Sequence, residues 1–262
     1  MIKRMVTSAV FAGFAAGLLA ALLHFAFVQK LILLGEDYET GAKVHFAGVA
    51  IDDPEAGHDH AVVAAEPLTD ATSGTSAEAI VEPDAHDHTA MDAEAERSPL
   101  QRNALTVLFF GLTYAGYALM LAAGFGLADA YGVTITARQG LLWGIAGYAA
   151  FQMMPAMGLS PELPGTPAAD LGARQIWWVG TALATSIALG LFGYAKGLLP
   201  FVAAVVLLAV PHVIGAPELD SFAGVAPPEL SAAFAARSLG IGLAVWTFMG
   251  WLAGYFWSNQ TA

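Results

Sequence analysis

Residues 197–217 read GLLPFVAAVVLLAVPHVIGAP, a run of 21 residues that contains no aspartate, glutamate, lysine or arginine. A helix rises about 1.5 Å per residue, so this run is long enough to cross the roughly 30 Å hydrocarbon layer of a bilayer. Five other stretches of at least this length also lack these four residue types: 5–29, 103–128, 139–161, 175–195 and 238–262. The sequence therefore predicts an all-α membrane protein, a polytopic bundle of about six transmembrane helices.

The composition supports the same class of protein. Hydrophobic residues make up 57% of the chain and charged residues only 12%, which argues against a soluble globule. The first apolar stretch follows Lys3 and Arg4, but it is longer than the apolar part of a signal peptide and no small-residue cleavage site follows it. We therefore expect it to be a retained helix. The chain has no cysteine, which excludes disulfides and thiolate metal ligands.

The apolar stretches divide the chain into three regions. A first helix is predicted within 1–34, an acidic, histidine-containing loop at 35–101, and a five-helix region at 102–262. The loop is rich in Ala, Asp, Glu, Pro, Thr and Ser and offers little apolar periodicity to pack, so we expect much of it to be disordered. The five later helices are predicted at about 103–128, 139–158, 175–195, 197–214 and 238–257.

Charge is distributed unevenly along the chain. The net charge is −12, and sixteen of the 22 acidic residues lie between Glu36 and Glu96. This argues against nucleic acid as a partner and for cations. Six crossings place both termini on one side, and all the acids except Asp129 then fall on the other. The lysines and arginines modestly favour cytoplasmic termini in the cell membrane, the bacterial inner membrane, with a periplasmic acidic loop.

Two of the predicted helices that run toward the acidic side end in similar sequences. Residues 155–163 (PAMGLSPEL) resemble residues 211–219 (PHVIGAPEL), and an Ala-Arg pair opens the returning helix after each, at Arg174 and Arg237. We hypothesise that the bundle consists of three tandem hairpins of one design. Chance similarity between helices rich in Gly, Pro and Ala is the alternative.

The acidic loop carries two His-Asp-His units, with histidines at 58, 60, 86 and 88. In an extended chain, residues two apart point the same way, so each unit could offer two imidazoles to one metal ion. Neutral imidazole suits Zn, Ni, Cu and Co, and the flanking carboxylates raise the local cation concentration. We interpret His58, His60, His86 and His88 as metal-gathering residues. A solvated acidic linker is the alternative.

Two further histidines lie inside apolar helices. His24 falls late in the first stretch and His212 late in the fifth, so both are expected toward the acidic face. An ionisable residue at membrane depth is a functional candidate, because it is costly without a partner; a single interhelical hydrogen bond is the alternative. Pro155 and Pro211 each free a carbonyl one turn earlier, which could line a cation path or only kink the helix.

Glu162 and Glu218 each follow a proline in a short loop on the acidic face. We include both carboxylates among the candidate metal ligands at the mouth of a pathway. Alternatively, they form salt bridges with Arg174 and Arg237, which begin the returning helices.

Several runs resemble a known family. The runs 140–148 (GLLWGIAGY), 155–165 (PAMGLSPELPG), 168–171 (AADL) and 174–178 (RQIWW), with 31–36 (LILLGE) near the start, are similar to the CbtA family of proposed cobalt transporter subunits. The likeness extends over nearly the whole chain, and PELPG and RQxWW are its most specific parts. It implies a membrane subunit linked to cobalt supply for cobalamin synthesis, accompanied by a small one-helix partner, CbtB, with a His-rich end. It carries over no settled metal ligands.

The sequence thus predicts a transporter and not an enzyme. Co²⁺, or Ni²⁺ or Zn²⁺, is expected as the transported ion, passing near His24 and His212, with no permanently bound cofactor. Ligand chemistry does not choose among these metals, and cobalt rests on the resemblance. No ATP-binding P-loop is present, so energy is expected from ion gradients or a separate component. The alternatives are a redox subunit whose two membrane histidines bind haem, and a scaffold that receives metal without transporting it.

Overall fold

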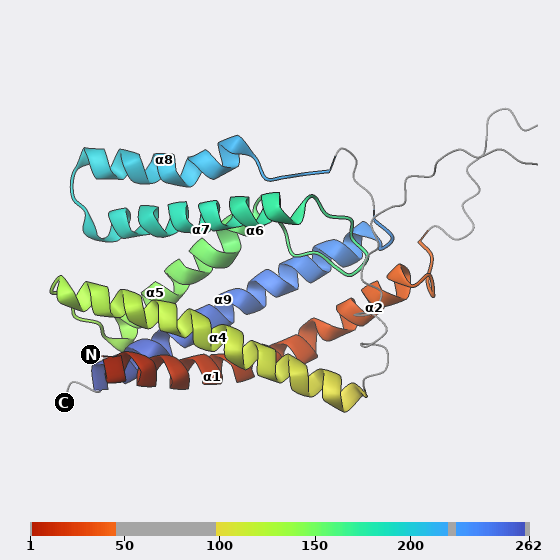
Figure 1. The fold of residues 1–262 in the computed structure, drawn as a ribbon, viewed down its shortest axis with the longest axis horizontal. Coiled ribbons are helices and arrows are strands. Elements are labelled where there is room, and N and C mark those ends of the chain that lie inside the picture. Colours follow the sequence, from red (N-terminus) through yellow and green to blue (C-terminus); the bar gives the residue numbers. More distant parts are fainter. Residues whose placement is uncertain (1, 46–97, 220–223, 260–262) are drawn as a thin grey trace, which may run out of the picture. The chain divides into compact units, whose positions relative to one another are not determined.

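The computed structural model describes residues 2–45, 98–219 and 224–259. Within these ranges every regular element is a helix (Figure 1). The chain divides into one unit of residues 1–45 and 103–262 and a second unit of residues 46–102, which contributes only residues 98–102 to the described ranges. The all-α prediction is therefore confirmed for the part of the chain that the structure describes.

Six helical segments account for the predicted membrane crossings. Four are single helices of sufficient length and apolarity: α1 (Ile2–Phe27), α4 (Pro99–Ala130), α7 (Leu171–Tyr194) and α9 (Pro228–Asn259). The fifth is the shorter apolar helix α8 (Leu198–Ile214). The sixth is a continuous helical stretch of three elements: α5 (Ala137–Tyr148), the π-helix η1 (Ala149–Met153) and α6 (Met154–Ala156). The chain is a multi-pass membrane protein.

Several helices extend beyond the predicted bounds. After α1, the helix α2 (Gln29–Glu39) continues past residue 34, so residues 35–39 are helical and not part of the loop. Gly35 is buried, and a Cβ added there would lie 3.3 Å from side-chain atoms of Leu163 and Pro164. The helix α2 therefore contacts the loop between α6 and α7. The helices α4 and α9 also begin earlier than predicted, because charged and polar residues can continue a helix outside the hydrocarbon.

Glycines allow α5 and α9 to touch backbone to backbone. A Cβ added to Gly250 would lie 2.5 Å from the Cα of Gly144, and one added to Gly254 would lie 2.8 Å from the Cα of Gly140. Real side chains do not approach backbone this closely, so only glycine permits the contact. Small residues at such interfaces are the usual means of packing helices in lipid, where apolar surface alone gives no preference for another helix.

The helix α1 packs in a similar way. A Cβ added to Gly17 would lie 2.6 Å from the Cα of Gly111 on α4, and α1 also packs against α9. At its start, the Arg4 Nε donates a hydrogen bond to the Trp257 carbonyl oxygen (2.8 Å), and the Arg4 Nη1 lies 3.4 Å from the Asp129 Oδ2. The beginning of α1 and the end of α9 therefore share one end of the bundle, the terminal end. We call the opposite end the distal end (Figure 1).

The helices α7 and α8 are consecutive and pack against each other as a hairpin. Figure 1 shows α7 between α8 and the α5–η1–α6 crossing, and α7 contacts η1 and α6 as well as α8. By contrast, α9 packs against α5 and α1. Three tandem hairpins would pair α8 with α9. Instead α8 packs against α7, and α9 packs against α5 through contacts between their glycines.

We expect Gly144→Ala to lower the free energy of unfolding by about 2 kcal/mol or more, since the new Cβ would meet the Trp246 carbonyl oxygen and lie 3.0 Å from the Gly250 Cα. Helix propensity alone favours alanine by about 1 kcal/mol, so it cannot cause a loss. The control is Gly116→Ala on α4, where no atom lies within 4 Å of an added Cβ. It should be neutral or stabilising. Thermal unfolding of the purified variants checks this, and equal effects would rule out the glycine contact as the cause.

Candidate functional site

The α5–η1–α6 crossing is interrupted just before Pro155. The backbone N–H of Met154 donates to the carbonyl oxygen of Ala149, five residues earlier, which is the π-helical pattern. Pro155 has no N–H, so the carbonyl of Phe151 lacks its usual α-helical donor. Single π-helical turns inside α-helices are frequent at functional sites. The π-helical turn before Pro155 thus widens the helix locally.

A polar side chain that the sequence analysis missed lies within this π-helix. The Gln152 Oε1 is buried and has no hydrogen-bond partner among the described residues. Its amide lies against α9, where a Cβ added to Gly242 would be 2.9 Å from the Gln152 Cδ. One turn further along α9, the Trp246 Nε1 is also buried and unpartnered within the described ranges. Gln152 is the only amide residue between Gln139 and Pro161. A single polar residue within an apolar crossing is a functional candidate, so the sequence could have indicated it.

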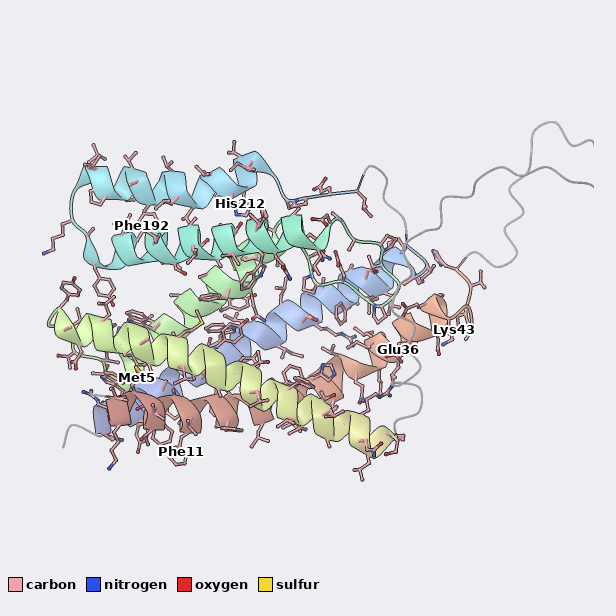
Figure 2. All side chains as sticks on the ribbon, viewed as in Figure 1. Met5, Phe11, Glu36, Lys43, Phe192 and His212 are labelled. Carbon is pink, nitrogen blue, oxygen red and sulfur yellow. The ribbon has the colours of Figure 1, made fainter. Side chains whose placement is uncertain are left out.

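Pro211 lies inside α8, which continues to Ile214, and the Pro211 carbonyl is held by a tryptophan of the neighbouring helix. The carbonyl oxygen of Pro211 accepts hydrogen bonds from the Trp177 Nε1 and from the Gly215 N–H, each at 3.1 Å. The next residue is His212, whose ring packs edge-on against Trp177 with centroids 6.0 Å apart. Figure 2 shows His212 on the side of α8 that faces α7.

The Nε2 of His212 is buried and has no hydrogen-bond partner among the described residues. A buried polar atom normally has a partner, so this nitrogen is an exception that calls for a cause. When it carries no proton, an imidazole nitrogen is a ligand for transition metals. Of the two membrane histidines, His212 is therefore the candidate metal ligand with an unpartnered ring nitrogen in the described structure.

Trp177 contacts both the segment after Pro155 and the Pro211 carbonyl. Gly158, just after α6, has room for no side chain, because an added Cβ would lie 2.6 Å from the Trp177 Cη2 and 2.7 Å from the Ala216 Cβ. The end of α6, the start of α7 and the segment after α8 therefore meet at Trp177, at the distal end. The similar sequences at 155–163 and 211–219 thus correspond to two helix ends that meet the same tryptophan.

The two predicted loop carboxylates differ in their surroundings. The Glu162 Oε2 lies 2.6 Å from the Arg174 Nη2, so this carboxylate forms the salt bridge that was the alternative to metal binding. Glu218 is exposed and makes no ion pair in the described part of the chain. Arg237 instead donates to the Phe27 carbonyl oxygen at 3.0 Å.

The other membrane histidine is not brought to this site. His24, near the end of α1, has its ring 5.3 Å from that of Phe110 on α4, and no ring contact joins it to His212 within the described ranges. Nor do the described residues contain a group of three or more His, Cys, Asp or Glu that could hold a metal ion. His58, His60, His86 and His88 lie outside the described residues.

Comparison with known proteins identifies the family. A family model described as probable cobalt transporter subunit (CbtA) matches residues 2–258, a range that includes Pro155, Pro211 and nearly all of the six crossings. No curated protein and no solved structure matches the chain. The matched family is one of transporter subunits and not of enzymes, which confirms both the resemblance and the expected class. The chain belongs to the CbtA family of probable cobalt transporter subunits.

Proposed function

We propose that this protein carries a divalent transition-metal ion across the cell membrane, and that the ion is cobalt for cobalamin synthesis. Membership of the CbtA family supports transport and supports cobalt. The structural observation that carries the proposal is the buried Nε2 of His212, which has no partner among the described residues and lies next to the proline inside α8. A nitrogen ligand held at membrane depth without a partner suits a site that binds an ion in passing.

The chemistry of the distal end suits an ion of borderline softness. Besides the His212 nitrogen, it holds the unpartnered amide oxygen of Gln152, and Pro155 removes the usual α-helical donor to the Phe151 carbonyl. Imidazole nitrogen and carbonyl oxygen accept Co²⁺, Ni²⁺ and Zn²⁺ alike. We propose that the ion keeps part of its water shell here, since a few protein ligands hold it weakly enough to be released. His24 is proposed as a separate ligand at the distal end of α1.

The proposed orientation places the terminal end in the cytoplasm of a bacterial cell. Four cationic residues support it: Lys3, Arg4, Arg138 and Lys196. The acidic loop would then face the periplasm, where its carboxylates concentrate cations and its four histidines gather metal. Glu218, exposed at the distal end, adds to this negative potential.

We also propose a second component of the transporter. The family is described as a subunit, which supports the presence of another chain. A small one-helix protein of the CbtB type, with a His-rich end, is the proposed partner. It would supply further imidazole ligands to an ion that His212 alone cannot hold.

We expect His212→Ala to reduce the initial rate of Co²⁺ uptake at least about tenfold at low cobalt, because a metal ligand is lost. Uptake of radioactive Co²⁺ into cells that express the full chain with its one-helix partner measures this. His24→Ala is tested in parallel, and His45→Ala, outside the crossings, is the control. The Nε2 of His212 makes no hydrogen bond in the described structure, so thermal stability should change little. Unchanged uptake in His212→Ala and His24→Ala would remove both histidines from the pathway.

Deleting residues 48–96 separates transport from metal reception by the loop. If the helices form the pathway, uptake should persist at high Co²⁺, and only the half-saturating concentration should rise, because the loop raises the local cation concentration. A scaffold that only receives metal in its loop would lose uptake at every concentration. A concentration series with the same cells and the same partner decides between the two.

A further inference from the structure

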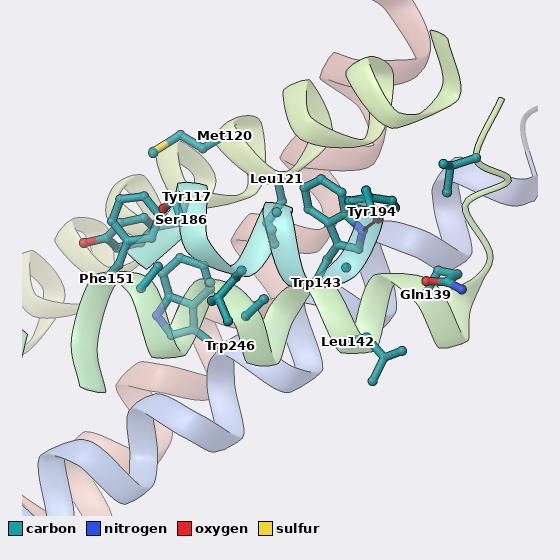
Figure 3. Close-up of a pocket in the computed structure, with 17 residues that line it drawn as sticks. Tyr117, Met120, Leu121, Gln139, Leu142, Trp143, Phe151, Ser186, Tyr194 and Trp246 are labelled. Atoms are coloured by element: carbon teal, nitrogen blue, oxygen red, sulfur yellow. Dashed lines mark hydrogen bonds between the residues drawn. The ribbon is translucent and has the colours of Figure 1, made fainter. Parts of the chain in front are cut away.

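A cavity of about 550 Å³ lies between α4, α5, η1, α7 and α9. Figure 3 shows the residues that line it. Its volume falls within the range of ligand-binding pockets. The walls are mostly aromatic and apolar, and they include Tyr117, Trp143, Phe151, Tyr194 and Trp246. Among the described residues, no carboxylate or histidine lines it, so its chemistry does not suit a transition-metal ion.

The cavity is long and begins at the terminal end. Gln139, near the start of α5, and Tyr194, the last residue of α7, line one part of it, and Phe151 in η1 lines another. Along the helix axis, Gln139 and Phe151 are separated by about 18 Å, which is more than half the thickness of the hydrocarbon layer. An elongated apolar ligand, parallel to the helices, fits this shape.

The cavity is open toward the lipid. Met120 on α4 and Leu142 on α5 both line it, lie at membrane depth and are 51% exposed. On α7, Gly190 and Gly193 also line it, and an added Cβ at either position would meet no atom within 4 Å. In a bilayer such a surface is covered by acyl chains, because water in an apolar space of this kind would lack hydrogen-bond partners.

Two cations are close in sequence to residues that line the terminal end of the cavity. Arg138 directly precedes Gln139, and Lys196 follows Tyr194 by two residues. Both are exposed, and neither forms an ion pair among the described residues. The Trp143 Nε1 donates to the Tyr194 hydroxyl oxygen at 3.0 Å, which links α5 to the end of α7. Basic residues beside an apolar groove, at the depth of the headgroups, complement a lipid phosphate.

We propose that this cavity binds one acyl chain of an anionic phospholipid, with the lipid's phosphate held by Arg138 and Lys196. The lipid would fill the space between the α7–α8 hairpin and the helices α4 and α5. This assignment does not depend on which ion the protein carries, nor on whether His212 binds it.

Native mass spectrometry of the full-length protein in detergent tests the proposal with phosphatidylglycerol and phosphatidylcholine of identical acyl chains. The wild type is expected to bind phosphatidylglycerol roughly 10- to 30-fold more tightly, since each cation near the membrane surface contributes about a fivefold preference. The double variant Arg138→Gln, Lys196→Gln should lose this preference. Equal affinity of the wild type for the two lipids would overturn the proposal.

Filling the cavity provides an independent arm of the experiment. Gly190→Leu and Gly193→Leu place side chains in open space within the cavity, and both are expected to lose phosphatidylglycerol binding while remaining folded. Gly180→Leu is the matched control, because it lies on the same helix with equally open space but does not line the cavity. Thermal unfolding confirms that each variant is folded. If folded Gly190→Leu or Gly193→Leu binds phosphatidylglycerol as tightly as Gly180→Leu does, the cavity is not the lipid site.

Discussion

The backbone contact between α5 and α9 determines much of the bundle. In lipid, helices gain little by burying apolar surface, so close packing selects which of them associate. Gly140 and Gly144 meet Gly250 and Gly254, and no residue with a side chain could replace them without moving the helices apart. Because α9 also packs against α1, this single contact places the α5–η1–α6 crossing next to the rest of the bundle. It also brings Gln152 against α9.

The α5–η1–α6 crossing then presents two different environments along its length. Toward the terminal end it forms a wall of an apolar cavity that suits a lipid chain. Toward the distal end it is interrupted at Pro155, and the α7–α8 hairpin meets it there through Trp177, which also holds the Pro211 carbonyl. Polar atoms without partners, including the His212 Nε2, occur on both sides of α7. An ion and a lipid would thus occupy separate parts of the structure, with the π-helix between them.

The sequence predicted the crossings well because the bilayer imposes a simple condition: a spanning segment must be long, apolar and internally hydrogen-bonded. It placed helix ends less well, since α2 and the early turns of α9 lie beyond the charge-free stretches. Of the two prolines, Pro155 follows a π-helical turn, whereas α8 continues through Pro211 to Ile214. Other features depend on tertiary packing, which no local pattern encodes. They are the pairing of α9 with α5, the contact of Gln152 with Gly242, and the separation of His24 from His212 into different helix pairs. The sequence also could not decide whether Glu162 binds a metal ion or pairs with Arg174, because that depends on which group lies nearby in the fold.

The central claim is that a divalent metal ion binds at His212 inside the membrane. Anomalous X-ray scattering at the cobalt edge, from crystals of the full-length protein grown in lipid with Co²⁺, locates the ion directly. The account predicts an anomalous peak at a coordination distance of about 2.1 Å from the His212 Nε2. Peaks confined to exposed carboxylates or to the acidic loop, with none beside His212, would contradict it.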